Sequence, residues 1–168
     1  MSVLSVLKAP HKILLTKTKK VEKFDESLED FIKDMNDTMK HEDGCGLAAN
    51  QVGVSKQIMI TSPVRDNETI YVFINPEIIS ESEDVCTMEE GCLSVPTGVI
   101  EVKRPESIKL SYQTITGEKR EELFSGFHAR IIQHEIDHLQ GKLIIDYVSK
   151  YKKDTILRKI KKLSSEEI

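Results

Sequence analysis

The sequence contains an H-E-x-x-H motif at residues 134–138, inside a segment whose pattern predicts a helix over Ser125–Gln140. Residues four apart lie on one face of a helix, so two imidazoles at this spacing can bind one divalent ion. The same face continues backwards through Phe127 and Ile131, and histidines on an apolar, core-facing stripe are costly unless their nitrogens are satisfied. This pattern therefore predicts a central, metal-binding helix with His134 and His138 as ligands.

The other positions of this helix divide into a general base and a polar face. Glu135 is rotated by about 100° from His134, which places its carboxylate beside the ion rather than on it, where a general base belongs. The opposite face is expected to be polar, and its residues are Arg130, Gln133, Asp137 and Gln140.

A catalytic metal needs a third protein ligand and one open position. The common zinc-peptidase pattern H-E-x-x-H-x-x-G-x-x-H does not supply it, because Gly141 is present but Ile144 stands where the third histidine belongs. Upstream cysteines are the alternative source. Cys92 lies between predicted strands and follows a glycine, whereas Cys45 and Cys86 are expected to be small buried side chains. From the residues alone, Cys92 is the best of three candidates.

Composition narrows the class of protein. The length of 168 residues suits one domain, 1–168, with its own core. Three cysteines do not form a disulfide framework and fit a reducing compartment, so the cytoplasm is expected. A net charge of −4 argues against general affinity for DNA, and no apolar run approaches the ~20 residues that span a bilayer.

Hydrophobic periodicity predicts an α+β fold in which short antiparallel sheets pack around the central helix. An N-terminal helix is expected over Glu26–His41 and a C-terminal helix over Lys150–Leu163. Residues 44–53 are expected to form a loop, and Asn75-Pro76 to form a turn. The expected strands are Gln57–Thr61, Thr69–Ile74, Val99–Val102, Ser107–Tyr112 and Lys119–Phe124.

Three motifs stand in order along the chain. They are G-C-G-L-A-A-N-Q at 44–51, E-G-C-L-S at 90–94 and H-E-I-D-H at 134–138. Together they resemble the peptide deformylase family at every fixed position, over nearly the whole chain, and the C-terminal helix resembles the bacterial type. The resemblance implies removal of formate from N-formylmethionyl peptides.

The resemblance also implies a role for each motif residue. Cys92, His134 and His138 would bind one divalent ion, Fe²⁺ by family resemblance with Zn²⁺, Ni²⁺ or Co²⁺ as alternatives, and water would take the fourth place. Glu135 would be the general acid and base. The Gln51 side-chain amide and the Leu93 backbone N–H would stabilise the oxyanion. Gly46 is expected to contact the substrate.

Supporting residues are predicted with alternatives left open. Glu90 and Arg104 are expected to pair and hold the Cys92 loop, unless they are two solvated surface charges. Asn50 is expected to be a turn residue. The C-terminal helix carries a basic stripe, which is either a solvated face or a docking surface for ribosomal RNA, where formylated nascent chains emerge.

Two other functions compete with a deformylase. An H-E-x-x-H endopeptidase would cleave internal peptide bonds and would not need Cys92. A ribosome-associated binding module with a structural metal would need a fourth protein ligand, for which the sequence offers no convincing candidate.

Overall fold

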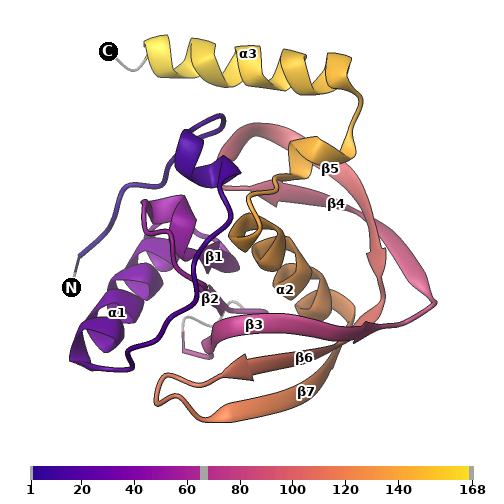
Figure 1. Ribbon diagram of the computed structural model, residues 1–168. Coiled ribbons are helices and arrows are strands. Elements are labelled where there is room, and N and C mark those ends of the chain that lie inside the picture. The colour runs from indigo at the N-terminus through magenta and orange to yellow at the C-terminus, as the bar shows by residue number, and fades with distance from the viewer. Residues whose placement is uncertain (1, 65–67, 167–168) are drawn as a thin grey trace.

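Helix α2 (Gly126–Leu139) lies at the centre of the fold, with antiparallel sheets on two sides of it, in the computed structural model of this chain (Figure 1). The structure describes residues 2–64 and 68–166. The predicted α+β arrangement of two antiparallel sheets around a central helix, with a helix toward each end of the chain, is confirmed.

The larger sheet has five strands in the order β1-β2-β3-β6-β7, and the smaller one is the hairpin β4-β5. All neighbouring strands are antiparallel. The bounds are β1 (Gly46–Ala48), β2 (Ile58–Thr61), β3 (Tyr71–Glu81), β4 (Val85–Cys92), β5 (Val95–Pro105), β6 (Ser107–Gln113) and β7 (Lys119–Ser125). Helix α2 contacts strands of both sheets, so residues on it can meet residues from either.

Helix α1 (Glu26–His41) begins and ends where the sequence predicts. The Asp25 side chain caps its start by accepting a hydrogen bond from the backbone N–H of Leu28 at 3.2 Å. Apolar side chains at helical spacing bury one face against β1 and β2; they are Leu28, Ile32, Met35 and Met39.

The C-terminal part forms the 3₁₀ helix η3 (Ile144–Tyr147) and the helix α3 (Lys150–Glu166), so the predicted helix extends beyond Leu163. Ile156, Leu157 and Ile160 pack α3 onto a core cluster that also contains Ile100 of β5. None of the helices in the described ranges is both long and apolar enough to cross a membrane.

Several local predictions were wrong because strand pairing overrides local turn signals. The expected loop at 44–53 contains β1 and the 3₁₀ helix η2 (Ala49–Val52). Strand β4 was not predicted, because its residues 85–92 lack a run of β-branched side chains and its only buried residue is Glu90. Strand β3 continues through Asn75-Pro76, where Asn75 adopts a positive φ of 52° and the register with β6 shifts.

The predicted polar face of α2 was wrong for Arg130 and Gln133, although Gln140 is exposed. Arg130 and Gln133 are buried, at 6% and 5% exposure, whereas Phe127 of the supposed apolar stripe is 47% exposed. The Gln133 amide donates to the Pro105 carbonyl, and Arg130 donates to two carbonyls of the β4-β5 hairpin, those of Cys86 and Val102. The hairpin covers this face, so its polar side chains are satisfied internally rather than by water.

Candidate metal centre and active site

Three side chains from two elements converge at one point. Cys92 ends β4, and His134 and His138 project from α2. The Cys92 Sγ lies 3.3 Å from His138 Nε2, and this nitrogen lies 3.3 Å from His134 Nε2. Ligands at tetrahedral angles around an ion with bonds of about 2.0–2.3 Å are about 3.3–3.6 Å apart, so the donor set fits a tetrahedral divalent ion.

The charge distribution around these ligands also favours a cation. Burial lowers the pKa of His134, but hydrogen bonds to Cys92 and Glu90 outweigh burial and raise it well above its usual value. The site therefore favours a positive charge between the sulfur and the carboxylate. Burial and the neighbouring His134 lower the pKa of His138 well below its usual value, which suits a neutral imidazole ligand.

Glu90 orients the His134 ring through its Nδ1 atom. Its Oε1 lies 2.9 Å from His134 Nδ1, which leaves Nε2 free to face Cys92 and His138. Arg104 donates two hydrogen bonds to the same carboxylate, at 2.6 and 2.8 Å, and Arg130 donates a third at 2.5 Å. Burial opposes ionisation of Glu90, yet the hydrogen bonds from Arg104 and His134 lower the pKa of its carboxyl to about 2.

The Glu90–Arg104 pair is buried, at 7% and 3% exposure, so these residues are not solvated surface charges. Arg104 continues the network by donating to Asp137 Oδ2 at 2.9 Å, and the Tyr147 hydroxyl donates to the same oxygen at 2.7 Å. This network fixes β4, β5, α2 and η3 relative to one another around the two histidines.

Glu135 lies beside the three ligands. Its Oε1 is 3.9 Å from His134 Nε2, and Oε2 is buried without a hydrogen-bond partner in the described part of the chain. Burial raises the pKa of this carboxyl from 4.5 to about 7. A carboxylate with this pKa and a free oxygen is suited to exchange a proton with water near neutral pH.

Gly46 on β1 makes room for Glu135. A Cβ built on Gly46 would lie 2.8 Å from Glu135 Oε1 and 2.8 Å from Ile131 Cγ2, closer than real Cβ contacts. A Cβ on Gly91 would instead have 3.9 Å to its nearest neighbour. The close approach that matters for this site is therefore between β1 and α2, at Gly46.

Gln51 lies on η2, and its amide is held in one orientation. The Ala48 N–H donates to Oε1 at 2.9 Å, so the NH₂ group faces the Ser94 hydroxyl at 3.1 Å and the Cys92 sulfur at 3.9 Å. Leu93 follows Cys92 in the turn between β4 and β5. Gln51 and Leu93 line the same cavity, so a side-chain amide and a backbone N–H are both available beside the ligand cluster.

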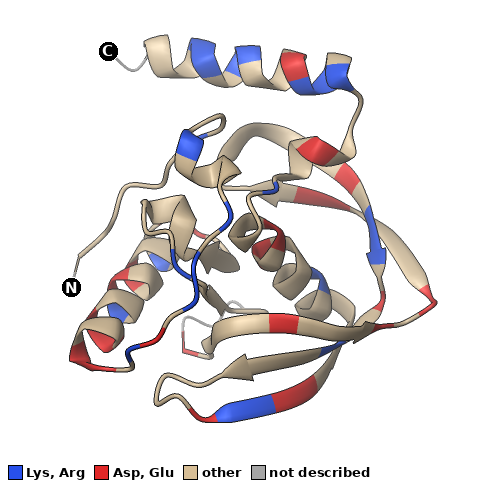
Figure 2. Cartoon of the chain, viewed as in Figure 1, with Lys and Arg blue, Asp and Glu red and all other residues tan. Residues whose placement is uncertain are grey.

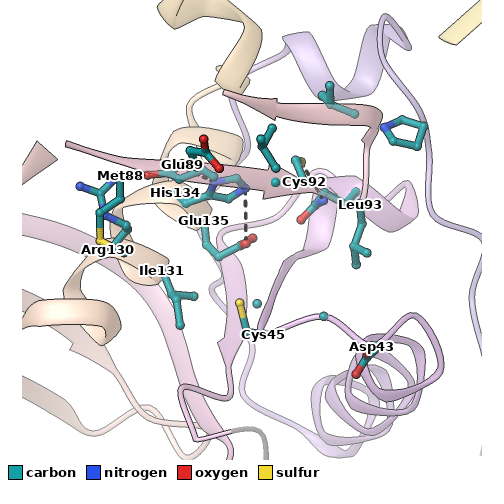
Figure 3. A pocket seen from close by; sticks show the side chains of 18 of the residues that line it. Asp43, Cys45, Met88, Glu89, Cys92, Leu93, Arg130, Ile131, His134 and Glu135 are labelled. Carbon is teal, nitrogen blue, oxygen red and sulfur yellow. Dashed lines mark hydrogen bonds and ion pairs between the residues drawn. The ribbon is translucent and has the colours of Figure 1, made fainter. Parts of the chain in front are cut away.

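A cavity of about 530 Å³ is lined by Gln51, Cys92, Leu93, His134 and Glu135. It is seen from close by in Figure 3, where a dashed line joins the Glu135 carboxylate to the His134 ring. Apolar side chains that are 44–57% exposed line the same cavity; they are Met88, Val99 and Phe127. Cys45 also lines it and is partly exposed, as is Cys86 elsewhere, so the prediction that both are buried was wrong. The cavity combines an apolar wall with a few convergent polar groups.

Residues 3–154 match the family model for polypeptide deformylase. The chain belongs to the peptide deformylase family. A peptide deformylase of Rickettsia conorii is 45% identical, over 98% of each chain. A peptide deformylase structure from Legionella pneumophila matches with a TM-score of 0.93 and 38% identity, covering 99% of this chain and 98% of that one. The enzyme from Ehrlichia chaffeensis in complex with actinonin matches with a TM-score of 0.92, 39% identity and coverage of 96% and 98%.

Peptide deformylases are metal-dependent hydrolases that remove the formyl group from N-formylmethionyl nascent peptides, and this chain is an enzyme of that kind. Its substrates are formylated peptides. Within the described residues the cluster of possible ligands has three members, Cys92, His134 and His138. Catalytic zinc sites have three protein ligands and one open position, whereas structural sites have four protein ligands.

Sequence reasoning missed three supporting residues of this peptide deformylase. Asn50 is fully buried and its side-chain amide donates to the His138 carbonyl at 2.5 Å, so it is more than a turn residue. Arg130 binds Glu90, although it was assigned to a polar face. Ser94 is buried against Gln51. Each acts across the fold, at separations of 40 or more residues, and no local pattern marks such a contact.

Proposed function

We propose that Cys92, His134 and His138 hold the catalytic metal ion and that Glu135 moves the proton in deformylation. The observation that carries this proposal is the convergence of three ligand atoms within 4.8 Å of one another beside a buried carboxylate, at a cavity lined by Cys92, His134 and Glu135. When bound there, a divalent cation supplies Lewis acidity, which acidifies water and polarises a carbonyl oxygen.

The remaining chemistry belongs to side chains and backbone of this chain. Glu135 accepts the proton of the water that attacks the formyl carbon, and it returns a proton to the leaving amine, so that formate and a free N-terminus result. The Gln51 amide and the Leu93 N–H donate to the formyl oxygen as negative charge grows on it, and one such donor is worth about 3 kcal/mol. The apolar wall receives the side chain of the formylated residue, and Gly46 lies along the path of the substrate backbone.

The donor set of one thiolate and two imidazoles suits several ions. We infer Fe²⁺ from the family, with Zn²⁺, Ni²⁺ or Co²⁺ as alternatives, since sulfur and nitrogen ligands accept all four. Three free cysteines and an oxygen-sensitive ion both fit a reducing cytoplasm.

The basic stripe on α3 supports docking on ribosomal RNA, near the place where nascent chains emerge. Figure 2 shows Lys and Arg gathered on this helix, and its exposed basic residues are Lys150, Lys152, Arg158, Lys159, Lys161 and Lys162. Ile160 on the same helix is buried, so the helix has one side in the core while these basic side chains remain accessible to a partner. Reversing Lys159, Lys161 and Lys162 to Glu should abolish salt-sensitive co-sedimentation with ribosomes, and unchanged co-sedimentation would refute docking through α3.

The test of the catalytic proposal separates metal binding from turnover. Glu135→Gln should retain one ion per chain and bind actinonin, the compound in the Ehrlichia chaffeensis complex, but lose at least about 10³-fold in kcat. Lys12→Met changes an exposed side chain on the 3₁₀ helix η1 (Lys12–Leu15); it is the matched control and should keep full activity. Near-normal turnover by Glu135→Gln would remove Glu135 from the mechanism.

A further inference from the structure

The N-terminal segment forms hydrogen bonds with two of the segments that build the active site. We call residues 7–9 the N-terminal strap. The backbone N–H of Leu7 donates to the Gln51 carbonyl at 2.7 Å, and the N–H of Ala9 donates to the Ser94 carbonyl at 2.9 Å. The strap thereby joins η2 to the turn after β4, two segments that lie more than 40 residues apart in sequence.

The strap is held in place by burial and by its two backbone hydrogen bonds. Ala9 is buried at 2% exposure, and Leu7 packs against the same core cluster as Cys92 and Val95. Its two backbone bonds end on residues that belong to, or adjoin, the proposed oxyanion donors Gln51 and Leu93. The separation of those two donors therefore depends on a short piece of chain outside the three sequence motifs.

Lys8 adds a third bond, and this one falls on Leu93 itself. The Lys8 Nζ donates to the Leu93 carbonyl at 2.8 Å. A charged donor makes a stronger hydrogen bond than a neutral one, and holding this carbonyl limits rotation of the turn. The N–H of Leu93 belongs to the preceding peptide group, which is joined to the held carbonyl group through the Cα of Leu93. Holding the carbonyl therefore narrows the range of orientations open to the N–H, through the two backbone dihedral angles of Leu93.

We propose that Lys8 is a positioning residue for deformylation: it holds the Leu93 turn so that the Leu93 N–H points at the formyl oxygen. This inference rests on the oxyanion roles proposed above for Gln51 and Leu93. Lys8 itself is exposed, and a single exposed contact adds little to folding stability, so its loss should change catalysis more than folding.

The experiment compares Lys8→Met, which keeps the length of the side chain, with Lys8→Arg, which restores a charged donor, and with Lys12→Met as the control. On metal-loaded enzyme, Lys8→Met should lower kcat for a formyl-Met peptide about tenfold, part of what loss of a whole donor costs. KM, metal content and Tm should not change, Lys8→Arg should recover most of kcat, and Lys12→Met should behave as the parent.

A second readout does not depend on turnover. In the metal-free protein, Lys8→Met should shift the NMR resonance of the Leu93 carbonyl carbon, and Lys12→Met should not. Normal kcat in Lys8→Met, or a loss of kcat that Lys8→Arg fails to recover, would overturn the proposal.

A Gln51→Ala variant distinguishes a failure of the Lys8 proposal from a failure of the oxyanion assignment on which it rests. If Gln51→Ala loses about 10²-fold or more in kcat while Lys8→Met loses nothing, the oxyanion assignment stands and the role of Lys8 is wrong. If Gln51→Ala keeps full activity, the oxyanion assignment itself fails.

Discussion

Gly46→Ala should impair catalysis by displacing Glu135 while the fold survives. The new Cβ would lie 2.8 Å from Glu135 Oε1 and 2.8 Å from Ile131 Cγ2, about 0.6 Å short of the 3.4 Å at which ordinary contact begins. Both neighbours are on buried faces of α2, so neither can swing into solvent. The shortfall must be absorbed by moving the Glu135 carboxylate, β1 or both.

The size of that shift sets the expected magnitudes. Overpacking of a buried contact typically costs about 1–3 kcal/mol, so the free energy of unfolding should fall by that amount. A displacement of about 1 Å at a catalytic group can cost about 10²-fold in rate, and a shift of about half that size should lower kcat about 10-fold. Metal content should be unchanged, because Gly46 does not contact a ligand of the proposed ion.

Urea unfolding, metal analysis and steady-state kinetics on a formyl-Met peptide measure the three quantities. Gly91→Ala is the matched control for folding, since its Cβ would have 3.9 Å of clearance, and its Tm and metal content should equal those of the parent. A Gly46→Ala enzyme with parental kcat and stability would show that β1 and α2 are not in close contact at Gly46.

Two further changes probe the buried network and a half-buried histidine. Arg104→Met leaves the buried negative charge of Glu90 less well compensated, so the free energy of unfolding measured in urea should fall by about 3 kcal/mol. A fall below about 1 kcal/mol would mean that the pair is not buried. Burial lowers the pKa of His128 below 6.5 although Glu122 opposes this, so the unfolded chain binds that proton more readily. The contribution of His128 to the free energy of unfolding should be full above pH 6.5 and should decrease as the pH drops through this value. His128→Phe should therefore weaken the decrease of Tm at falling pH. An unchanged dependence of Tm on pH would contradict this expectation.

The sequence predicted the elements whose signals are local. Helix α1 has a capping aspartate and an apolar stripe, and α2 carries the histidine pair, so both were predicted close to their observed bounds. Strand β4 and the continuation of β3 beyond Asn75 were not, because pairing with a neighbouring strand stabilises them rather than their own propensity.

The same distinction holds in the site. The proposed ligands and Glu135 follow from motifs, but Arg130, Asn50 and Lys8 make their contacts across the fold. Arg130 in particular has the pattern of a solvated helix face, and only the β4-β5 hairpin packed over it turns it into a buried partner of Glu90. Helical spacing alone does not reveal which second element covers a face.

X-ray absorption at the K-edge of the bound metal, measured anaerobically, tests whether Cys92 joins His134 and His138 around one ion. We expect one sulfur at about 2.3 Å and two nitrogens at about 2.0–2.1 Å, with the sulfur scattering lost in Cys92→Ser. A spectrum without sulfur, or an unchanged first shell in Cys92→Ser, would contradict it.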